Sequence, residues 1–256
     1  MKRLAGKAAL VTGASQGIGL GIALRLAEEG ADIALNVLQD NAAAAETQAR
    51  IAALGVRCLV LPFDVTDLPA MRAAVERAVQ GLGALHILVN NAGIEKRAPF
   101  LEVAEQDYDR VMAVNLKGAF FLAQAFAAHR QAAGQGGRII NISSVHENLP
   151  FPNFAPYCLS KGGMRMMMRN LAIELAPLGI TVNNIAPGAI ETPINARLMN
   201  DPALKEPLLA RIPQGRLGKP ADVAGVAAFL ASDDADYVTA TTTVVDGGLL
   251  WNYAEQ

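Results

Sequence analysis

The chain has little cysteine and almost no net charge, and both features restrict its function. Cys58 and Cys158 are the only cysteines in 256 residues. Two cysteines cannot form a disulfide framework, which fits a reducing compartment. The chain has 22 lysines and arginines against 24 aspartates and glutamates and no basic tract, so we expect no nucleic acid partner and no anionic membrane partner. No cluster of metal-ligating residues is evident either, so we expect no metal site.

The chain also lacks long apolar runs and internal repeats. No run approaches the ~20 residues of a membrane span. Met1–Leu4 leads directly into an apolar strand instead of the hydrophobic region of a signal peptide. We therefore expect a soluble, cytoplasmic protein with no membrane partner. A composition that is 52% hydrophobic over this length, without a linker, predicts a single domain over residues 1–256.

Short apolar runs alternate with helical stretches along the chain. Strands are expected at 8–11, 32–37, 56–62, 86–89, 138–142, 181–186 and 241–245. Helices are expected up to residue 29, over 41–54, from about 67, over 107–129, after Pro156 and over 220–230. This alternation predicts an α/β fold, a doubly wound parallel sheet with helices on both faces. Residues 190–215 contain a polar, proline-broken stretch, which we interpret as a substrate lid.

A glycine-rich turn follows the first strand. Unpaired amides at the start of a helix attract an anion. Gly13 would permit the tight turn, Gly17 the close approach of a phosphate, and Gly19 the close packing of helix on strand. Because a strand precedes this turn and a helix follows it, a dinucleotide site is favoured over a purely structural turn.

The residues that end the second strand bear on the choice of coenzyme. A carboxylate there would bind the adenosine ribose, and an arginine would bind a 2′-phosphate. The chain has Asn36, Val37 and Leu38 instead, and Gln16 in the glycine turn is also uncharged. With no cation to neutralise a phosphate, NAD is modestly preferred over NADP, and Asn36 is the candidate contact to the ribose.

Three later turns also follow strands and therefore belong to the same edge of the sheet. Asp64 either accepts a bond from the adenine amino group or caps the helix that starts near residue 67. The turn Asn90–Gly93 has small residues past which a coenzyme could run. Pro187–Pro193 follows the sixth strand, where Thr192 and the backbone of Ile190 could bind the nicotinamide carboxamide.

Tyr157 and Lys161 are four residues apart, which places both on one face of a helix. A phenol titrates near pH ~10, and a neighbouring ammonium favours its ionised form. Tyr157 could then exchange protons with a substrate, while Ser144, at the end of the preceding strand, orients the substrate oxygen. The alternative is an ordinary surface helix that carries a tyrosine and a lysine by chance. The glycine turn favours the catalytic interpretation.

Asn115 lies among apolar residues of the 107–129 helix. A buried amide must find hydrogen-bond partners. It either bridges backbone groups or holds a water that links Lys161 to solvent.

These motifs together resemble the short-chain dehydrogenase/reductase family over essentially the whole chain. The resemblance implies a seven-stranded Rossmann-type sheet, hydride transfer between NAD(P) and an alcohol or carbonyl, and a homotetramer. It also implies a catalytic tetrad of Asn115, Ser144, Tyr157 and Lys161, with Ser144 rather than Ser143 at the matching spacing. The expected coenzyme contacts are Gly13, Ser15, Gln16, Gly17, Ile18, Gly19, Asn36, Asp64, Val65, Asn91, Ala92, Gly93, Tyr157, Lys161, Pro187, Gly188, Ile190 and Thr192.

Within the family, the segments 143–147, 160–164 and 183–196 are most similar to bacterial glucose 1-dehydrogenases. That similarity implies oxidation of an aldose such as glucose at C1 to the lactone. The implied substrate contacts are Glu95, Ser144, His146, Tyr157 and Asn195. Glu95 and His146 could instead pair with each other. The alternative functions are a 3-oxoacyl-carrier-protein-type carbonyl reductase and, from another class, a non-catalytic dinucleotide-binding regulatory protein.

Overall fold

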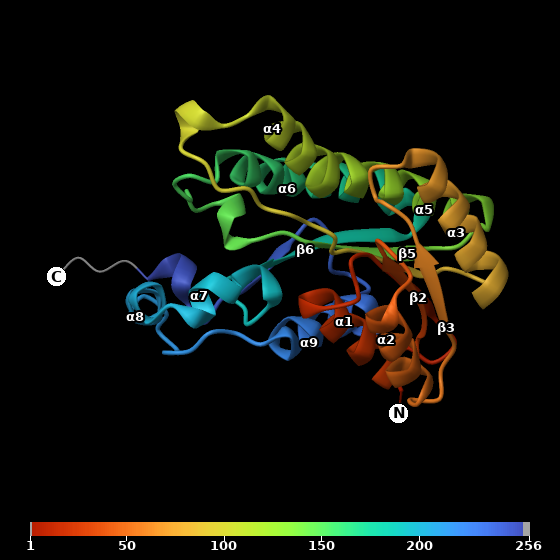
Figure 1. Cartoon of the computed structure of the whole chain (residues 1–256). Coiled ribbons are helices and arrows are strands. Elements are labelled where there is room, and N and C mark those ends of the chain that lie inside the picture. Colours follow the sequence, from red (N-terminus) through yellow and green to blue (C-terminus); the bar gives the residue numbers. More distant parts are fainter. Residues whose placement is uncertain (1, 253–256) are drawn as a thin grey trace.

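The computed structural model describes residues 2–252, and seven parallel strands form one sheet at its centre (Figure 1). Their order across the sheet is β3-β2-β1-β4-β5-β6-β7. The chain therefore builds outward from β1 first on one side and then on the other, which confirms the expected Rossmann-type topology. The strands are β1 Ala8–Val11, β2 Asp32–Val37, β3 Cys58–Pro62, β4 Ile87–Asn90, β5 Gly137–Ile142, β6 Ile180–Pro187 and β7 Thr242–Val245.

Helices cover both faces of the sheet, with α3 to α6 above it and α1, α2 and α9 below it in Figure 1. Successive residues of β1 point to opposite faces, as strand geometry requires. Ala9 and Val11 pack with α1 and α9, whereas Ala8 and Leu10 pack with α3 and α5. The helices on these faces are α1 Gly17–Glu28, α2 Ala42–Ala52, α3 Leu68–Leu82, α4 Glu105–Met112, α5 Ala119–Ala132, α6 Ala155–Leu175 and α9 Pro220–Ala231.

The helix expected over 107–129 is interrupted. Between α4 and α5, residues Ala113–Gly118 form a π-helix, η2. Its last residue, Gly118, lies so close to the loop after β3 that an added Cβ would be 2.7 Å from the carbonyl oxygen of Val65. The whole run Glu105–Ala132 is long and apolar enough to cross a membrane by length and composition, which the sequence analysis did not anticipate. Half of its most apolar window is buried within the fold, so packing accounts for much of this character.

The expected lid contains short helices. Pro193–Asn195 is a 3-10 turn, followed by α7 Ala196–Asn200 and α8 Pro202–Leu209. Ile190 pairs with Gly218 in an isolated parallel bridge, which ties together the two ends of the segment. In Figure 1 these helices extend to one side of the sheet, near α9. Their movement stays a prediction.

Candidate active site

The candidate residues come together at the carboxyl edge of the sheet. The glycine turn follows β1, Asn90–Gly93 completes and follows β4, Ser144 follows β5, and Gly188 follows β6. β1, β4, β5 and β6 are consecutive in the sheet. Because all strands are parallel, their carboxyl ends meet at one edge, where open α/β sheets bind ligands.

The glycine turn has the geometry that a phosphate site needs. Gly13 and Gly17 have φ of +60° and +58°, a region that favours glycine. An added Cβ at Gly19 would lie 2.4 Å from the Asn91 amide nitrogen. At the start of α1, Gln16 makes no side-chain capping bond, and the first turn has no acidic residue. The first amides of α1 are therefore not capped by a side chain, which fits the pyrophosphate of a dinucleotide.

Asn91 and Thr12 join the glycine turn to the turn after β4. The Asn91 side-chain amide donates to the carbonyl oxygens of Thr12 and Gly13 at 2.8 and 3.1 Å. The Thr12 hydroxyl accepts from the backbone amides of Asn91 and Ala92, both at 2.9 Å. Asn91 thus fixes the shape of the dinucleotide turn through its side chain.

Asn36 bonds backbone groups around it. Its side chain is buried, accepts from the Gly13 amide at 3.1 Å and donates to the carbonyl oxygens of Val37, Leu61 and Phe63. The side chain thus holds two strands and the glycine turn together, and its contact with the ribose stays a prediction. Beside it, the side chain of Leu38 is 65% exposed.

Asp64 is not the cap of α3. Asp67 caps that helix and accepts from the Ala70 amide. Asp64 accepts from the amide and hydroxyl of Thr66 at 2.9 and 2.8 Å, and it pairs with Arg110 at 3.0 Å. Although burial opposes them, the bonds from Thr66 and Arg110 lower the pKa of Asp64. The carboxylate is therefore charged and fixed beside Val65, and contact with adenine stays a prediction.

Ser144, Tyr157 and Lys161 form a compact group. The Ser144 hydroxyl lies near the Tyr157 phenol, whose pKa it lowers, and it accepts from the His146 amide at 3.1 Å. The Lys161 ammonium nitrogen is 5.6 Å from the centroid of the Tyr157 ring and donates to the Ile142 carbonyl oxygen at 2.8 Å. Gly93 lies beside them, since its added Cβ would be 3.8 Å from that nitrogen.

The structure does not show the acidification expected for Tyr157. Burial raises the pKa of the phenol to about 12, more than the Ser144 hydroxyl lowers it. Burial also lowers the pKa of Lys161 to about 8. Both shifts have the same cause, because loss of water disfavours the charged form of each group. The sequence predicted the contact but not this desolvation.

Asn115 bridges backbone groups. Its oxygen accepts from the Ile94 amide at 2.8 Å, and its amide group donates to the Ile94 carbonyl at 2.9 Å and to Ser160 Oγ at 3.0 Å. The Ser160 hydroxyl in turn donates to the Tyr157 carbonyl. The side chain therefore joins the π-helix, the β4 turn and α6, and the water relay stays a prediction.

Two of the expected substrate contacts, Glu95 and His146, lie near Tyr157. Burial raises the pKa of Glu95, whose charge in turn raises the pKa of Tyr157. The His146 ring lies 6.2 Å from the Tyr157 ring and stacks on Phe151 at 4.3 Å, and Phe151 stacks on Phe154. Glu95 and His146 form no ion pair with each other within the described range 2–252. The sequence analysis did not predict that Phe151 and Phe154 would stack beside His146, although their spacing beyond His146 was visible in the sequence.

The Pro187–Pro193 segment lies against the glycine turn. Thr192 is buried, its hydroxyl donates to the Ile190 carbonyl, and an added Cβ at Gly17 would lie 3.4 Å from its methyl group. The Asn195 amide also donates to that carbonyl, at 2.8 Å. Asn195 therefore orders the start of the lid, and its expected contact with substrate stays a prediction.

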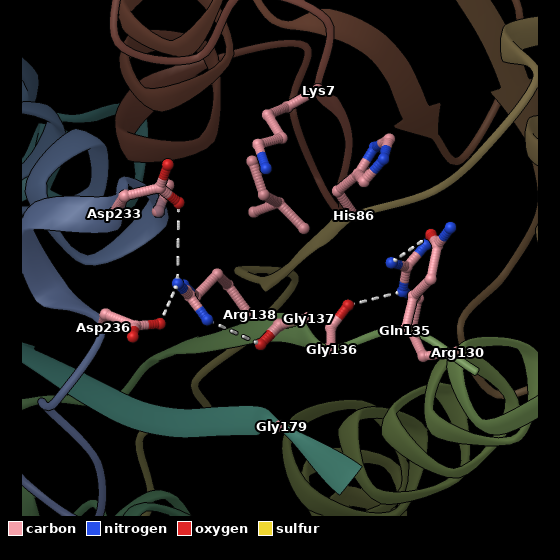
Figure 2. A pocket seen from close by; sticks show the side chains of 12 residues that line it. Lys7, His86, Arg130, Gln135, Gly136, Gly137, Arg138, Gly179, Asp233 and Asp236 are labelled. Carbon is pink, nitrogen blue, oxygen red and sulfur yellow. Dashed lines mark hydrogen bonds and ion pairs between the residues drawn. The ribbon is translucent and has the colours of Figure 1, made fainter. Parts of the chain in front are cut away.

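A separate polar hollow of about 370 Å³ opens at the amino edge of the sheet (Figure 2). Arg138 pairs there with Asp233 and Asp236, as Figure 2 shows. His86 accepts from the Ala8 amide through Nδ1. The hollow lies at the opposite edge from Tyr157, so it is no part of the candidate active site.

A family model described as enoyl-(acyl carrier protein) reductase matches residues 13–250. The chain belongs to the short-chain dehydrogenase/reductase family, as its motifs indicate, and it is an NAD(P)-dependent oxidoreductase.

Relatives within the family differ in substrate. The chain is 42% identical over 246 residues to 3beta-hydroxysteroid dehydrogenase 1 of Eggerthella lenta, covering 96% of this chain and 94% of the relative. It is 40% identical over 252 residues to L-rhamnose 1-dehydrogenase (NAD(P)(+)) of a Sphingomonas species, covering 98% and 99%. A solved gluconate 5-dehydrogenase from Burkholderia cenocepacia, in complex with NADP and tartrate, matches with a TM-score of 0.92, 42% identity and coverage of 97% and 96%. The narrower likeness to glucose 1-dehydrogenases is not confirmed.

Proposed function

We propose that the protein oxidises a neutral sugar at its anomeric hydroxyl, an aldose such as glucose at C1 to the lactone, with NAD as the preferred coenzyme. The observation that supports it best is the contact of Ser144, Tyr157 and Lys161 beside a glycine turn that suits a dinucleotide. The protein acts in the cytoplasm and forms one catalytic domain.

Each side chain has one task in this reaction. Ser144 orients the sugar oxygen, and Tyr157 takes its proton. Lys161 supplies the positive charge that offsets the desolvation of the phenolate and binds the nicotinamide ribose. When bound, the coenzyme supplies the hydride acceptor. Asn115 keeps the backbone of α6 in place beneath Tyr157.

The charge next to Tyr157 favours a neutral sugar over a sugar acid. Glu95 is the acidic group whose field reaches the phenol, and a carboxylate there accepts bonds from hydroxyls but repels a second carboxylate. The rhamnose relative is named for oxidation at position 1. The gluconate relative, solved with tartrate, makes a sugar acid the second candidate.

The preference for NAD follows from the end of β2. The exposed Leu38 side chain stands where a cation would be needed to bind a 2′-phosphate. One relative is named for use of NAD or NADP and another was solved with NADP, so the preference is to be tested with both coenzymes.

A panel assay tests this proposal. Absorbance of reduced nicotinamide is followed with neutral aldoses, sugar acids, steroid alcohols and 3-oxoacyl thioesters, with each coenzyme in turn. We expect kcat/KM to be highest for a neutral aldose with NAD, by about tenfold or more over any sugar acid. Highest activity on a sugar acid would favour the second candidate. Coenzyme binding without turnover on any compound would favour a regulatory protein.

We also propose that the subunits assemble into a homotetramer through the face formed by α4, α5 and α6. A groove of about 700 Å³ runs along this face and is lined by Leu116, Phe120, Met167 and Leu171 among others. The Phe120 and Ile173 side chains are 41% and 72% exposed, and burial against a second copy would remove them from water.

Light scattering coupled to gel filtration checks the assembly. The double variant Phe120→Glu, Ile173→Glu is expected to have half the wild-type mass or less, because four or more carboxylates would meet in the interface of each dimer. Leu204→Glu, at a 40% exposed apolar residue of α8, is the matched control and should keep the wild-type mass. An unchanged mass for the double variant would assign the interface to another face.

A further inference from the structure

Three buried asparagines form a ladder across neighbouring strands. Asn90 of β4 pairs in register with Asn141 of β5, and Asn141 with Asn184 of β6. The Asn90 amide donates to the Asn141 oxygen at 2.9 Å, and the Asn141 amide donates to the Asn184 oxygen at 3.0 Å. All three are buried. Each asparagine therefore donates to the next one along the ladder. The side-chain amide of Asn184, the last of the three, is left to donate to another group.

That donor reaches a buried carboxylate. The Asn184 amide donates to Glu147 Oε2 at 3.2 Å, and the Ser143 hydroxyl donates to the same oxygen at 2.5 Å. The Glu147 side chain is 1% exposed. Its other oxygen, Oε1, has no hydrogen-bond partner within the described residues and lies 3.7 Å from Arg165 Nε. A buried charge held this way costs stability unless a cation compensates it.

Lys161 supplies a buried cation in the same region. It is 4% exposed and bonds the carbonyl of Ile142, the residue before Ser143. Tyr157, Lys161 and Arg165 follow one another at four-residue intervals on α6, so they form one stripe of that helix. Within this stripe, Lys161 faces the end of β5 and Arg165 faces Glu147.

We propose that Glu147 is a positioning residue of this active site: its carboxylate, fixed by the asparagine ladder and Ser143, holds the end of β5, where the Ile142 carbonyl binds Lys161, and supplies a buried negative charge to the stripe of α6 that carries Lys161 and Arg165. The inference rests on the proposed role of Lys161 in the reaction. The proposal also explains the asparagine ladder, because three uncharged amides hold the carboxylate in place without adding a charge of their own.

The charged groups around Lys161 support this role of Glu147. Burial lowers the pKa of Lys161, and the Glu147 charge opposes that effect. Tyr157, Cys158 and Arg165 are the other titratable groups of this part of α6, and His146 and Glu95 approach from the neighbouring loops. Burial lowers the pKa of the His146 imidazole and raises that of the Cys158 thiol, so it favours the neutral form of both.

Thermal unfolding against pH tests the proposal without a substrate. Glu147→Gln keeps the shape and the acceptor for Ser143 but removes the charge. Its unfolding midpoint is expected to fall by about 5 °C or more near pH ~6.5, where Lys161 is protonated. The deficit should shrink by about half or more near pH ~9.5, because a neutral amine no longer needs the carboxylate. Glu46→Gln, at an exposed position of α2, is the matched control and should follow the wild type.

Arg165→Gln gives the opposite pH trend. With Arg165 removed, the Glu147 charge depends on Lys161 alone, so the deficit of this variant should grow as pH rises and Lys161 loses its proton. A deficit of Glu147→Gln that does not change with pH would mean hydrogen bonding only and would overturn the proposal. If Glu147→Gln does not fold, a flat deficit for Arg165→Gln overturns it instead. Absence of turnover in the panel assay would refute the proposed function and leave this comparison intact.

Discussion

Tyr157→Phe is expected to lower kcat/KM by about 10³-fold or more while dinucleotide affinity stays within a factor of about three. The phenol lies near Ser144, and the centroid of its ring is 5.6 Å from the Lys161 ammonium nitrogen. Removal of one oxygen leaves the ring, its packing against His146 and the glycine turn in place. Proton transfer is lost, and coenzyme binding is not.

Steady-state rates and dinucleotide titration by fluorescence measure the two effects separately. Tyr237→Phe is the matched control, because Tyr237 is fully exposed and follows Asp236, which pairs with Arg138 at the amino end of β5, far from the carboxyl edge. Wild-type turnover by Tyr157→Phe would remove this residue from the mechanism. Equal losses in binding and turnover would indicate a packing role instead.

Gly19→Ala is expected to abolish measurable dinucleotide binding and to destabilise the fold by about 1 to 3 kcal/mol. The added methyl group would lie 2.4 Å from the Asn91 amide nitrogen and 2.5 Å from the Gly13 carbonyl oxygen. Both atoms belong to the bonds that join the glycine turn to the turn after β4. Relief of the clash therefore moves the backbone that would bind the pyrophosphate.

Gly225→Ala is the control for the glycine substitution. Gly225 lies within α9 with open space around its added Cβ, so alanine there should stabilise the protein by about 0.5 to 1 kcal/mol. Denaturant unfolding gives the stability change, and dinucleotide titration gives the binding. Wild-type affinity in Gly19→Ala would show that the coenzyme binds elsewhere.

The sheet was predictable because its central strands are buried on both faces. Ala8–Val11 is apolar throughout, and β4 has three apolar residues before Asn90. Short apolar runs between helices have few alternatives to a parallel strand. The ends of elements were less certain. The expected strand at 56–62 begins at Cys58, and that at 181–186 extends from Ile180 to Pro187, since register with the neighbouring strand decides where pairing stops.

Polar residues in the site were harder to assign than glycines. The φ of Gly13 follows from its residue type, but Asn36 offers the same amide to a ribose or to a backbone. Only the positions of β3 and the glycine turn show that it bonds backbone groups. The π-helix around Asn115 likewise depends on contacts with α6 and the β4 turn, which the local sequence does not contain.

Glu147 was overlooked for a related reason. Asn90, Asn141 and Asn184 are each visible in the sequence at the end of an expected strand, yet only the parallel register shows that they are level. Asn90 and Asn141 are 51 residues apart along the chain, and Asn141 and Asn184 are 43 apart. A pattern over such separations cannot be detected from local periodicity.

The same three amides also select against strand slippage during folding. If β5 shifted by one residue against β4 and β6, the Asn141 side chain would point to the opposite face of the sheet. The buried amides of Asn90 and Asn184 would then lose their partner. Contacts this distant in sequence form late, because the intervening chain must first be closed into a loop. Correct alignment of the central strands and completion of the catalytic edge are therefore one event, and a misaligned sheet gains neither.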